Sequence, residues 1–153
     1  MSYFSTVPDA LAALVAMFAT APGLDGVEVI DGPPVKDSSA LESVAVGYSP
    51  SDGVDAVEMT SGFGDLGSSR DRESYTVHCT LGVLNGDRDT LTARTRAYQL
   101  YDAVGFVITD DPTLRKTVMK ASLGAHNFAQ NDTNGGLLAR VDFSVTVDAF
   151  TGR

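Results

Sequence analysis

The amino-acid sequence predicts an α+β fold, in which a mainly antiparallel sheet carries two amphipathic helices packed on one face and ends in a long C-terminal β-hairpin. Three observations predict this class. Two segments repeat apolar residues with helical spacing, residues 74–83 alternate between apolar and polar side chains, and two further alternating stretches flank a polar turn near the C-terminus. Two helices are too few to alternate with the strands, so a parallel α/β sheet is not expected.

The first helix is expected to begin at Pro8, because proline suits the first turn of a helix, and to end at Pro22-Gly23. Asp9 lies beside the positive end of this helix. Apolar residues recur at i, i+3, i+4 and i+7: Leu11, Leu14, Val15 and Phe18. Ala10, Ala13 and Met17 widen this stripe. The helix should therefore lie on a sheet through this stripe.

Three short strands are expected next, at residues 27–30, 43–48 and 54–61. Pro33 and Pro34 follow the first of them. Since proline donates no backbone hydrogen bond, that segment should leave the sheet or run along its edge.

The long strand at residues 74–83 should bury one side and expose the other. Its expected buried side chains are Tyr75, Val77, Cys79, Leu81 and Val83. A second helix follows, with Asp87 placed to cap its N-terminus and residues 109–112 ending it. The buried stripe of that helix is expected to comprise Ala97, Leu100, Tyr101, Val104 and Ile108.

Two alternating strands should close the sheet as an antiparallel hairpin. On the apolar side, the first strand should place Thr117, Met119, Ala121, Leu123 and Ala125, and the second should place Val141, Phe143, Val145, Val147 and Ala149. Residues 130–136, QNDTNGG, form the expected polar turn between them.

The length of 153 residues suits one domain, residues 1–153, with a sizeable core. The longest apolar stretch, residues 10–19, is too short to cross a bilayer, so no membrane partner is expected. A single cysteine allows neither an internal disulfide nor a metal site built from cysteines, and it favours a reducing compartment.

The net charge of −9 is unevenly placed. Ten of the 20 acidic residues, but only one of the 11 basic residues, fall within residues 1–65. Such an acidic surface repels phosphates and argues against a reader of nucleic-acid sequence. It either keeps the protein soluble or provides a face that avoids DNA or meets a basic partner.

The stretch GFGDLG at residues 62–67 matches the GxGxxG pattern of dinucleotide-binding loops. That chemistry needs a helix N-terminus after the last glycine. A strand follows here instead, and Asp65, Asp71 and Glu73 would repel a phosphate. Residues 62–73 are therefore expected to be a loop between strands, and loops of this length are usually functional or disordered.

The histidines and the cysteine do not form a recognisable site. His78 and Cys79 are neighbours in a strand, so they should point to opposite faces and cannot share a metal ion or a proton. His126 has no cysteine or glutamate at ligand spacing. No catalytic residue, cofactor or metal is expected, and the protein is not expected to be an enzyme.

Several segments together resemble one known family. They are APGL (21–24), GVEVIDGPP (26–34), VAVGY (44–48), the charged RDRE (70–73) before the long strand and ARTRAY (93–98) in the second helix, followed by the closing hairpin. Their order over nearly the whole chain resembles the tail-terminator proteins of long-tailed (siphovirus-type) bacteriophages, particularly those that infect actinobacteria.

This resemblance implies a structural protein of the virion, assembled in the host cytoplasm and located at the head-proximal end of the tail. Such proteins form a ring, typically hexameric, on the last disc of the tail tube, where the ring stops tube polymerisation. The implied partners are the protein itself, the tail tube protein and the head–tail connector protein, with DNA only passing through the hole.

The candidate interface residues of such an assembly are Gly64, Asp65, Arg70, Asp71, Arg72, Glu73 and Arg140. In the loop, glycine and serine provide freedom, and the charged side chains are expected to pair once a partner holds them. Two alternatives remain open. One is another neck component, such as a head-closure or tail-completion protein, and the other is a small ligand-binding or enzymatic α+β domain with a pocket under its helices.

Overall fold

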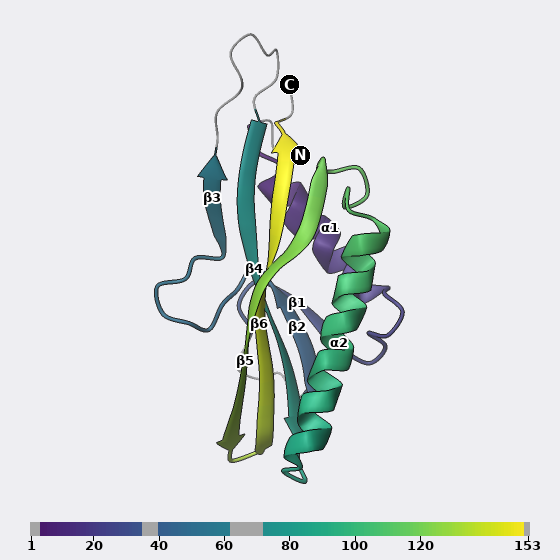
Figure 1. Cartoon of the computed structure of the whole chain (residues 1–153), viewed down its shortest axis with the longest axis vertical. Coiled ribbons are helices and arrows are strands. Elements are labelled where there is room, and N and C mark those ends of the chain that lie inside the picture. The colour runs from purple at the N-terminus through teal and green to yellow at the C-terminus, as the bar shows by residue number, and fades with distance from the viewer. Residues whose placement is uncertain (1–3, 35–39, 62–71, 152–153) are drawn as a thin grey trace.

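The computed structural model describes residues 4–34, 40–61 and 72–151, and it has the expected α+β architecture (Figure 1). In chain order the elements are α1 (Val7–Ala19), β1 (Glu28–Asp31), β2 (Glu42–Val46), β3 (Val57–Ser61), β4 (Arg72–Asn85), α2 (Thr90–Asp110), β5 (Lys120–Thr133) and β6 (Gly136–Phe150). Neither helix in this described part is long and apolar enough to span a membrane.

The described strands form one sheet in the order β1-β2-β4-β6-β5, and β3 also pairs with β4. Neighbouring strands are antiparallel except β1 and β2, which are parallel. One edge of β4 is divided between two partners, because β3 pairs with residues 74–77 and β2 with residues 79–83. His78 lies at the changeover, where its backbone N–H donates to the Ala56 carbonyl and its carbonyl accepts from the Tyr48 N–H, both at 2.9 Å.

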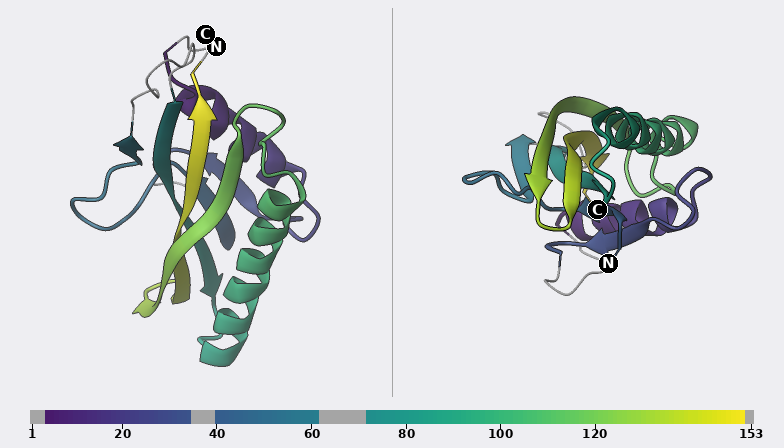
Figure 2. Two further views of the ribbon diagram at one scale, coloured as in Figure 1. Left: turned by 45° about the horizontal axis from the view of Figure 1, so that its top comes forward. Right: turned by 90° about the horizontal axis from the view of Figure 1, so that it is seen from below.

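Both helices contribute residues to one buried cluster, which also includes residues of β2, β4 and β6. Figure 2 shows the two helices and the sheet from two further directions. The alternation in β4 is confirmed, since all of its expected apolar residues are buried: Tyr75, Val77, Cys79, Leu81 and Val83. In α2 the expected stripe is buried apart from the half-buried Tyr101. α2 therefore packs against β4 and β6, and α1 packs against β1 and β2.

The buried residues of α1 all belong to the expected widened stripe, but the centre of the buried face differs from the one expected. Ala10 and Met17 are buried with Leu14 and Phe18, whereas Leu11 and Val15 are only half-buried. Apolar residues surround most of this helix, so helical spacing alone does not select the centre of the face that packs on the sheet.

The expected cap of α2 is wrong by two residues. Asp89, and not Asp87, is the N-cap, and its Oδ1 accepts a hydrogen bond from the Thr92 N–H at 3.2 Å. The reason is that β4 extends to Asn85, so the turn that follows is completed only at Arg88, which adopts a positive φ of 55°.

The closing hairpin is confirmed, but its first strand begins later than expected. Thr117 and Met119 precede β5, which then has a bulge between Leu123 and His126. The bulge changes the alternation: Leu123 lies opposite Val145 and His126 opposite Phe143, while Ala125 is exposed. The expectation that Ala125 is buried is therefore wrong, because an extra residue in one strand moves the following side chains to the other face.

The turn of the hairpin is also tighter than expected. β5 continues to Thr133, which pairs with Gly136, so Asn134 and Gly135 alone connect the strands. Gly136 has a φ of +138°, and a Cβ at this position would lie 2.9 Å from the Asn85 carbonyl carbon. Glycine is needed there because a side chain would meet the backbone at the end of β4.

Candidate assembly surfaces

The candidate interface residues are only partly within the described residues. Gly64, Asp65, Arg70 and Asp71 lie outside them. Arg72 is exposed at the first position of β4, where it lies opposite Phe150 in β6. It is the candidate that most clearly presents a charge at the surface.

The structure corrects the expectation for Glu73, because this residue is not a free surface charge. Glu73 is only 4% exposed. Its Oε1 accepts hydrogen bonds from the Thr6 backbone N–H at 2.6 Å, the Thr6 hydroxyl at 2.8 Å and the Ser5 hydroxyl at 3.2 Å. The carboxylate thus lies at the N-terminus of α1, where the helix dipole favours a negative charge. The Glu73 side chain therefore connects α1 to β4 within the chain.

Tyr75 belongs to the same buried group. Its hydroxyl lies 2.8 Å from the Thr6 hydroxyl, and burial raises the pKa of Tyr75 to about 12. The start of α1, the start of β4 and a tyrosine two residues further along therefore form one hydrogen-bonded unit. In the sequence, the β4 part of this unit follows directly after residues 62–71.

Arg140 lies far from Arg72 and Glu73. It is opposite Gly82, whereas Glu73 is opposite Ala149, so they occupy opposite parts of the β4–β6 pair. The Arg140 Nε lies 3.1 Å from Asp142 Oδ1, and its side chain is 28% exposed. Among the described candidates, the structure thus places Arg140 apart from Arg72 and Glu73.

The histidines and the cysteine lie apart, as the alternation of the strands predicted for His78 and Cys79. Cys79 is buried, and burial raises the pKa of its thiol to about 12. His78 is on the opposite face, with its Nε2 3.4 Å from Glu58 Oε1. His126 instead lies against α2, where its Nε2 is 3.2 Å from the Tyr98 hydroxyl and its ring centroid is 4.7 Å from that of Tyr101. Across residues 4–34, 40–61 and 72–151, no three histidine, cysteine, aspartate or glutamate residues gather as metal ligands would.

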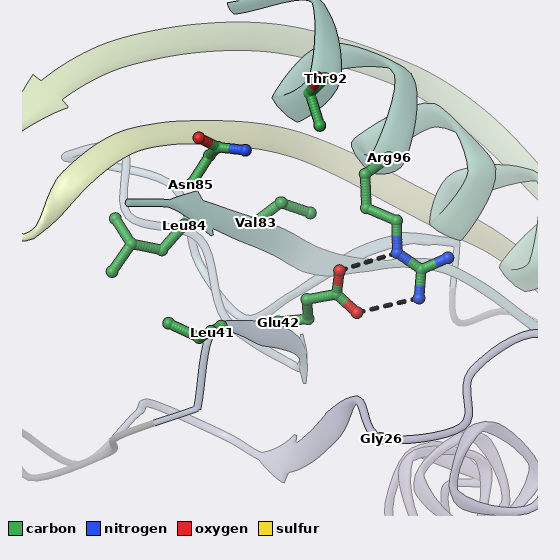
Figure 3. Close-up of a pocket in the computed structure, with 8 residues that line it drawn as sticks. All are labelled: Gly26, Leu41, Glu42, Val83, Leu84, Asn85, Thr92 and Arg96. Carbon is green, nitrogen blue, oxygen red and sulfur yellow. Dashed lines mark hydrogen bonds and ion pairs between the residues drawn. The ribbon is translucent and has the colours of Figure 1, made fainter. Parts of the chain in front are cut away.

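A hollow of about 440 Å³ lies between the start of β2 and the N-terminal half of α2 (Figure 3). Its lining residues are Gly26, Leu41, Glu42, Val83, Leu84, Asn85, Thr92 and Arg96. A second hollow, of about 430 Å³, continues along α2 and shares Thr92 and Arg96 with the first. Two apolar side chains stand beside these hollows, since Leu41 is 63% exposed and Leu91 is 62% exposed.

An ion pair joins the two walls of the hollow. The Arg96 Nε donates to Glu42 Oε2 at 2.7 Å, and Nη2 donates to Oε1 at 2.9 Å, which is the two-point geometry of a strong arginine–carboxylate pair (Figure 3). The hydrogen bond to Glu42 raises the pKa of Arg96 above its ordinary value. Because the carboxylate already neutralises the guanidinium, the hollow offers apolar contact more than a charged ligand site.

Sequence reasoning missed this surface. Glu42 and Arg96 are 54 positions apart, and neither stands out in its local pattern. A weak signal was present in Leu91, which lies outside the apolar stripe of α2 yet is large and apolar. Leu41, just before a predicted strand, is a similar case.

Comparisons with known proteins identify no family. No family model matches the sequence, and no curated protein matches it. A solved structure to which the chain is similar is described as the virion of a native gene transfer agent (GTA) particle. It is 15% identical, the match covers 94% of this chain and 91% of that chain, and the TM-score is 0.45. At a TM-score this low the similarity does not establish a common fold, and it assigns no role to this chain.

Proposed function

We propose that this chain is a structural tail-terminator protein of a long-tailed bacteriophage. It forms a ring on the end of the tail tube, stops the polymerisation of the tube and provides the surface to which the head connector docks. One observation carries this proposal: the order of sequence segments from APGL to the closing hairpin, which resembles that family over nearly the whole chain.

The exposed apolar side chains support a role in assembly. Large apolar residues at the surface of the described part are Phe4, Leu41, Met59, Leu91, Phe106 and Met119. Apolar residues that cluster at a surface commonly mark contacts with other proteins. Leu41 and Leu91 do so beside the two hollows of α2, where a partner could cover both.

The acidic excess supports the passage of DNA without binding. The net charge of −9 lies within residues 1–65, and this acidic part of the chain repels phosphates. A ring through which DNA slides must not hold the backbone, so an acidic protein suits this position. The same charge also suits the alternative of another neck component, which would share the size and the acidity.

The alternative of a small ligand-binding or enzymatic domain has less support. A hollow beside His78 measures only about 170 Å³, and the hollow at Arg96, of about 440 Å³, offers such a ligand more room. Its single cation is already paired with Glu42 in two-point geometry. A ligand with a carboxylate or phosphate would have to displace Glu42 to reach the guanidinium.

Negative-stain electron microscopy of the purified protein, alone and mixed with isolated tail tubes, tests the proposal. Sixfold rings, or tubes closed by a cap at one end, are expected. The protein should also restore tails of uniform length to a phage that lacks its own terminator. If the protein neither forms rings nor caps tubes, the proposal is wrong. If it instead joins heads to tails that are already capped, it is another neck component.

A further inference from the structure

The connection from α2 to β5 contains a left-handed turn of the backbone. Leu114, Arg115 and Lys116 have positive φ angles of 49°, 59° and 65°. This conformation is uncommon for residues other than glycine, and strained backbone of this kind is found mainly where a protein binds or switches. Leu114 is fully buried, whereas Arg115 and Lys116 are exposed. The turn therefore anchors one side chain in the core and presents the next two to solvent.

Hydrogen bonds within the chain hold this turn in one shape. The Asp111 carboxylate accepts from the Thr113 N–H at 3.2 Å, from the Thr113 hydroxyl at 2.6 Å and from the Arg115 N–H at 2.9 Å. The Pro112 carbonyl accepts from the Ala121 N–H at 2.7 Å, so the turn also covers the edge of β5 at this point. Any contact that another molecule makes here is therefore made through side chains of the turn, and not through strand pairing with Ala121.

The turn and the first residue of β5 form a basic surface, which comprises Arg115, Lys116 and Lys120. All three residues are exposed, and residues 112–120 include no acidic residue. This local excess of positive charge contrasts with the chain as a whole, whose net charge is −9.

The acidic residues nearest to the basic surface are engaged elsewhere. Asp111 accepts the hydrogen bonds that hold the turn. Asp148 lies opposite Lys120 in the β5–β6 pair, and it accepts a hydrogen bond from the Ser74 hydroxyl. In the described part of the chain, neither Lys116 nor Lys120 forms an ion pair. The two lysines are therefore available to a carboxylate of another molecule.

An acidic surface lies on the other side of the molecule. It comprises Asp52, Asp55 and Glu58, which are exposed where the chain passes from β2 into β3, and residues 47–60 include no base. Glu58 lies near His78, but Asp52 and Asp55 form no ion pair with any described residue. In Figure 1 this connection is at the left and the basic turn at the upper right, and the second view of Figure 2 also separates them.

We propose that the basic surface of one copy contacts the acidic surface of the next copy in the ring. A second copy is the partner that the charges favour, because the chain itself carries the complementary surface on its opposite side. Two different surfaces meet, so the contact is head-to-tail and repeats until a ring closes. Complementary charges fix the orientation of the copies, and a turn that is already held in shape has little conformational freedom to lose on contact. This inference rests on the proposed ring and names the surfaces that build it.

Charge reversal tests the contact. Lys116→Glu/Lys120→Glu and Asp52→Lys/Asp55→Lys should each lose rings on tail tubes, since like charges then face each other. The variant that carries all four substitutions should regain rings, because the two surfaces are again opposite in charge. Arg94→Glu, at an exposed residue in the first half of α2, is the matched control and should form rings as the parent does. Unchanged melting temperatures show that each variant folds.

The unmodified protein allows a test without any substitution. A carbodiimide joins a lysine amine to a carboxylate only where the two groups are in contact. It should link Lys116 or Lys120 of one copy to Asp52 or Asp55 of another copy. Mass spectrometry of a mixture of isotope-labelled and unlabelled protein identifies the links that join different copies. Absence of such links, in concentrated protein and on capped tubes, overturns the proposed contact.

The two proposals fail in different ways. If the parent forms rings and both reversed variants do so equally well, the contact is wrong while the ring stands. If the parent forms no ring, the ring proposal fails, and carbodiimide links in concentrated solution still decide the contact. If the lysine variant loses rings, the aspartate variant keeps them and the combined variant does not regain them, the basic surface contacts the tail tube and the proposed contact is wrong.

Discussion

The Glu42 carboxylate and the Arg96 guanidinium join the start of β2 to the second turn of α2 through hydrogen bonds of 2.7 and 2.9 Å. Their side chains are 24% and 34% exposed. The pair therefore connects the start of β2 to α2, and it lines the hollow between them (Figure 3).

We expect a measurable coupling energy between Glu42 and Arg96. In a double-mutant cycle with Glu42→Ala and Arg96→Ala, the coupling should be about 1 kcal/mol in the free energy of unfolding, because the pair is partly buried and makes two hydrogen bonds. The pair of Arg88 and Asp132, whose side chains are 49% and 70% exposed, is the control and should show almost none. Urea unfolding measures both cycles. Equal couplings in the two cycles would contradict the role given to the partly buried pair of Glu42 and Arg96.

Truncation of the core should destabilise the protein strongly. Leu100→Ala and Phe143→Ala each remove a fully packed side chain between the helices and the sheet, and each should cost about 2–5 kcal/mol in the free energy of unfolding. Leu91→Ala on the exposed side of α2 should leave the melting temperature nearly unchanged. Thermal melts that match the parent for both core variants would contradict the observed packing.

Gly136 should tolerate no side chain. Gly136→Ala combines a φ of +138° with a Cβ close to the Asn85 backbone, so it should destabilise the protein by about 2 kcal/mol or more. The neighbouring Gly135→Ala is the control, because a Cβ there meets only the Leu84 side chain, at 3.4 Å. Denaturant unfolding compares the two variants. A similar loss of stability at both positions would show that the close approach of Gly136 to Asn85 is not what limits substitution.

The protein should lose stability at alkaline pH in two overlapping steps. Burial raises the pKa of Cys79 from 9.0 to about 12 and that of Tyr75 from 10.0 to about 12. Between these values the folded chain keeps protons that the unfolded chain has lost. The stabilising contribution is therefore complete below pH 9 and is lost as the pH rises towards 12.

Two substitutions separate these steps in unfolding curves measured across alkaline pH. Cys79→Ala should remove the part of the decline that begins near pH 9, and Tyr75→Phe the part that begins near pH 10. In the native parent a thiol reagent should react with Cys79 only as the chain unfolds, since the thiol is buried. A variant with an unchanged alkaline slope would show that the substituted group does not titrate on unfolding.

The cap of α2 gives a prediction with a neighbouring control. Asp89→Ala should lower the melting temperature, because the Asp89 side chain accepts the Thr92 N–H. Asp87→Ala should have no such effect. The bonds to Thr92 lower the pKa of Asp89 below its ordinary 3.8, so its contribution is present above that value and is lost as the pH falls further. If Asp87→Ala lowered the melting temperature more than Asp89→Ala, Asp87 would be the cap, as expected from the sequence.

The sequence by itself determined those features that depend on local spacing. The alternation of β4 decides that Cys79 is buried and His78 is not, since successive side chains of a strand point to opposite faces. In the same way, helical spacing located both helices, and the number of helices relative to strands indicated the α+β class. These features follow from local backbone geometry, and the spacing of apolar residues within each segment reflects that geometry.

Only the tertiary structure decided the features that join distant segments. Glu73 is buried because Ser5 and Thr6, more than sixty positions away, supply its hydrogen-bond donors. Glu42 meets Arg96 because β2 takes only half of one edge of β4 and brings its start beneath α2. The bulge in β5 likewise depends on its partner β6. Register and burial arise from the packing of the whole sheet against both helices. A local sequence pattern does not indicate which distant strand will lie beside it.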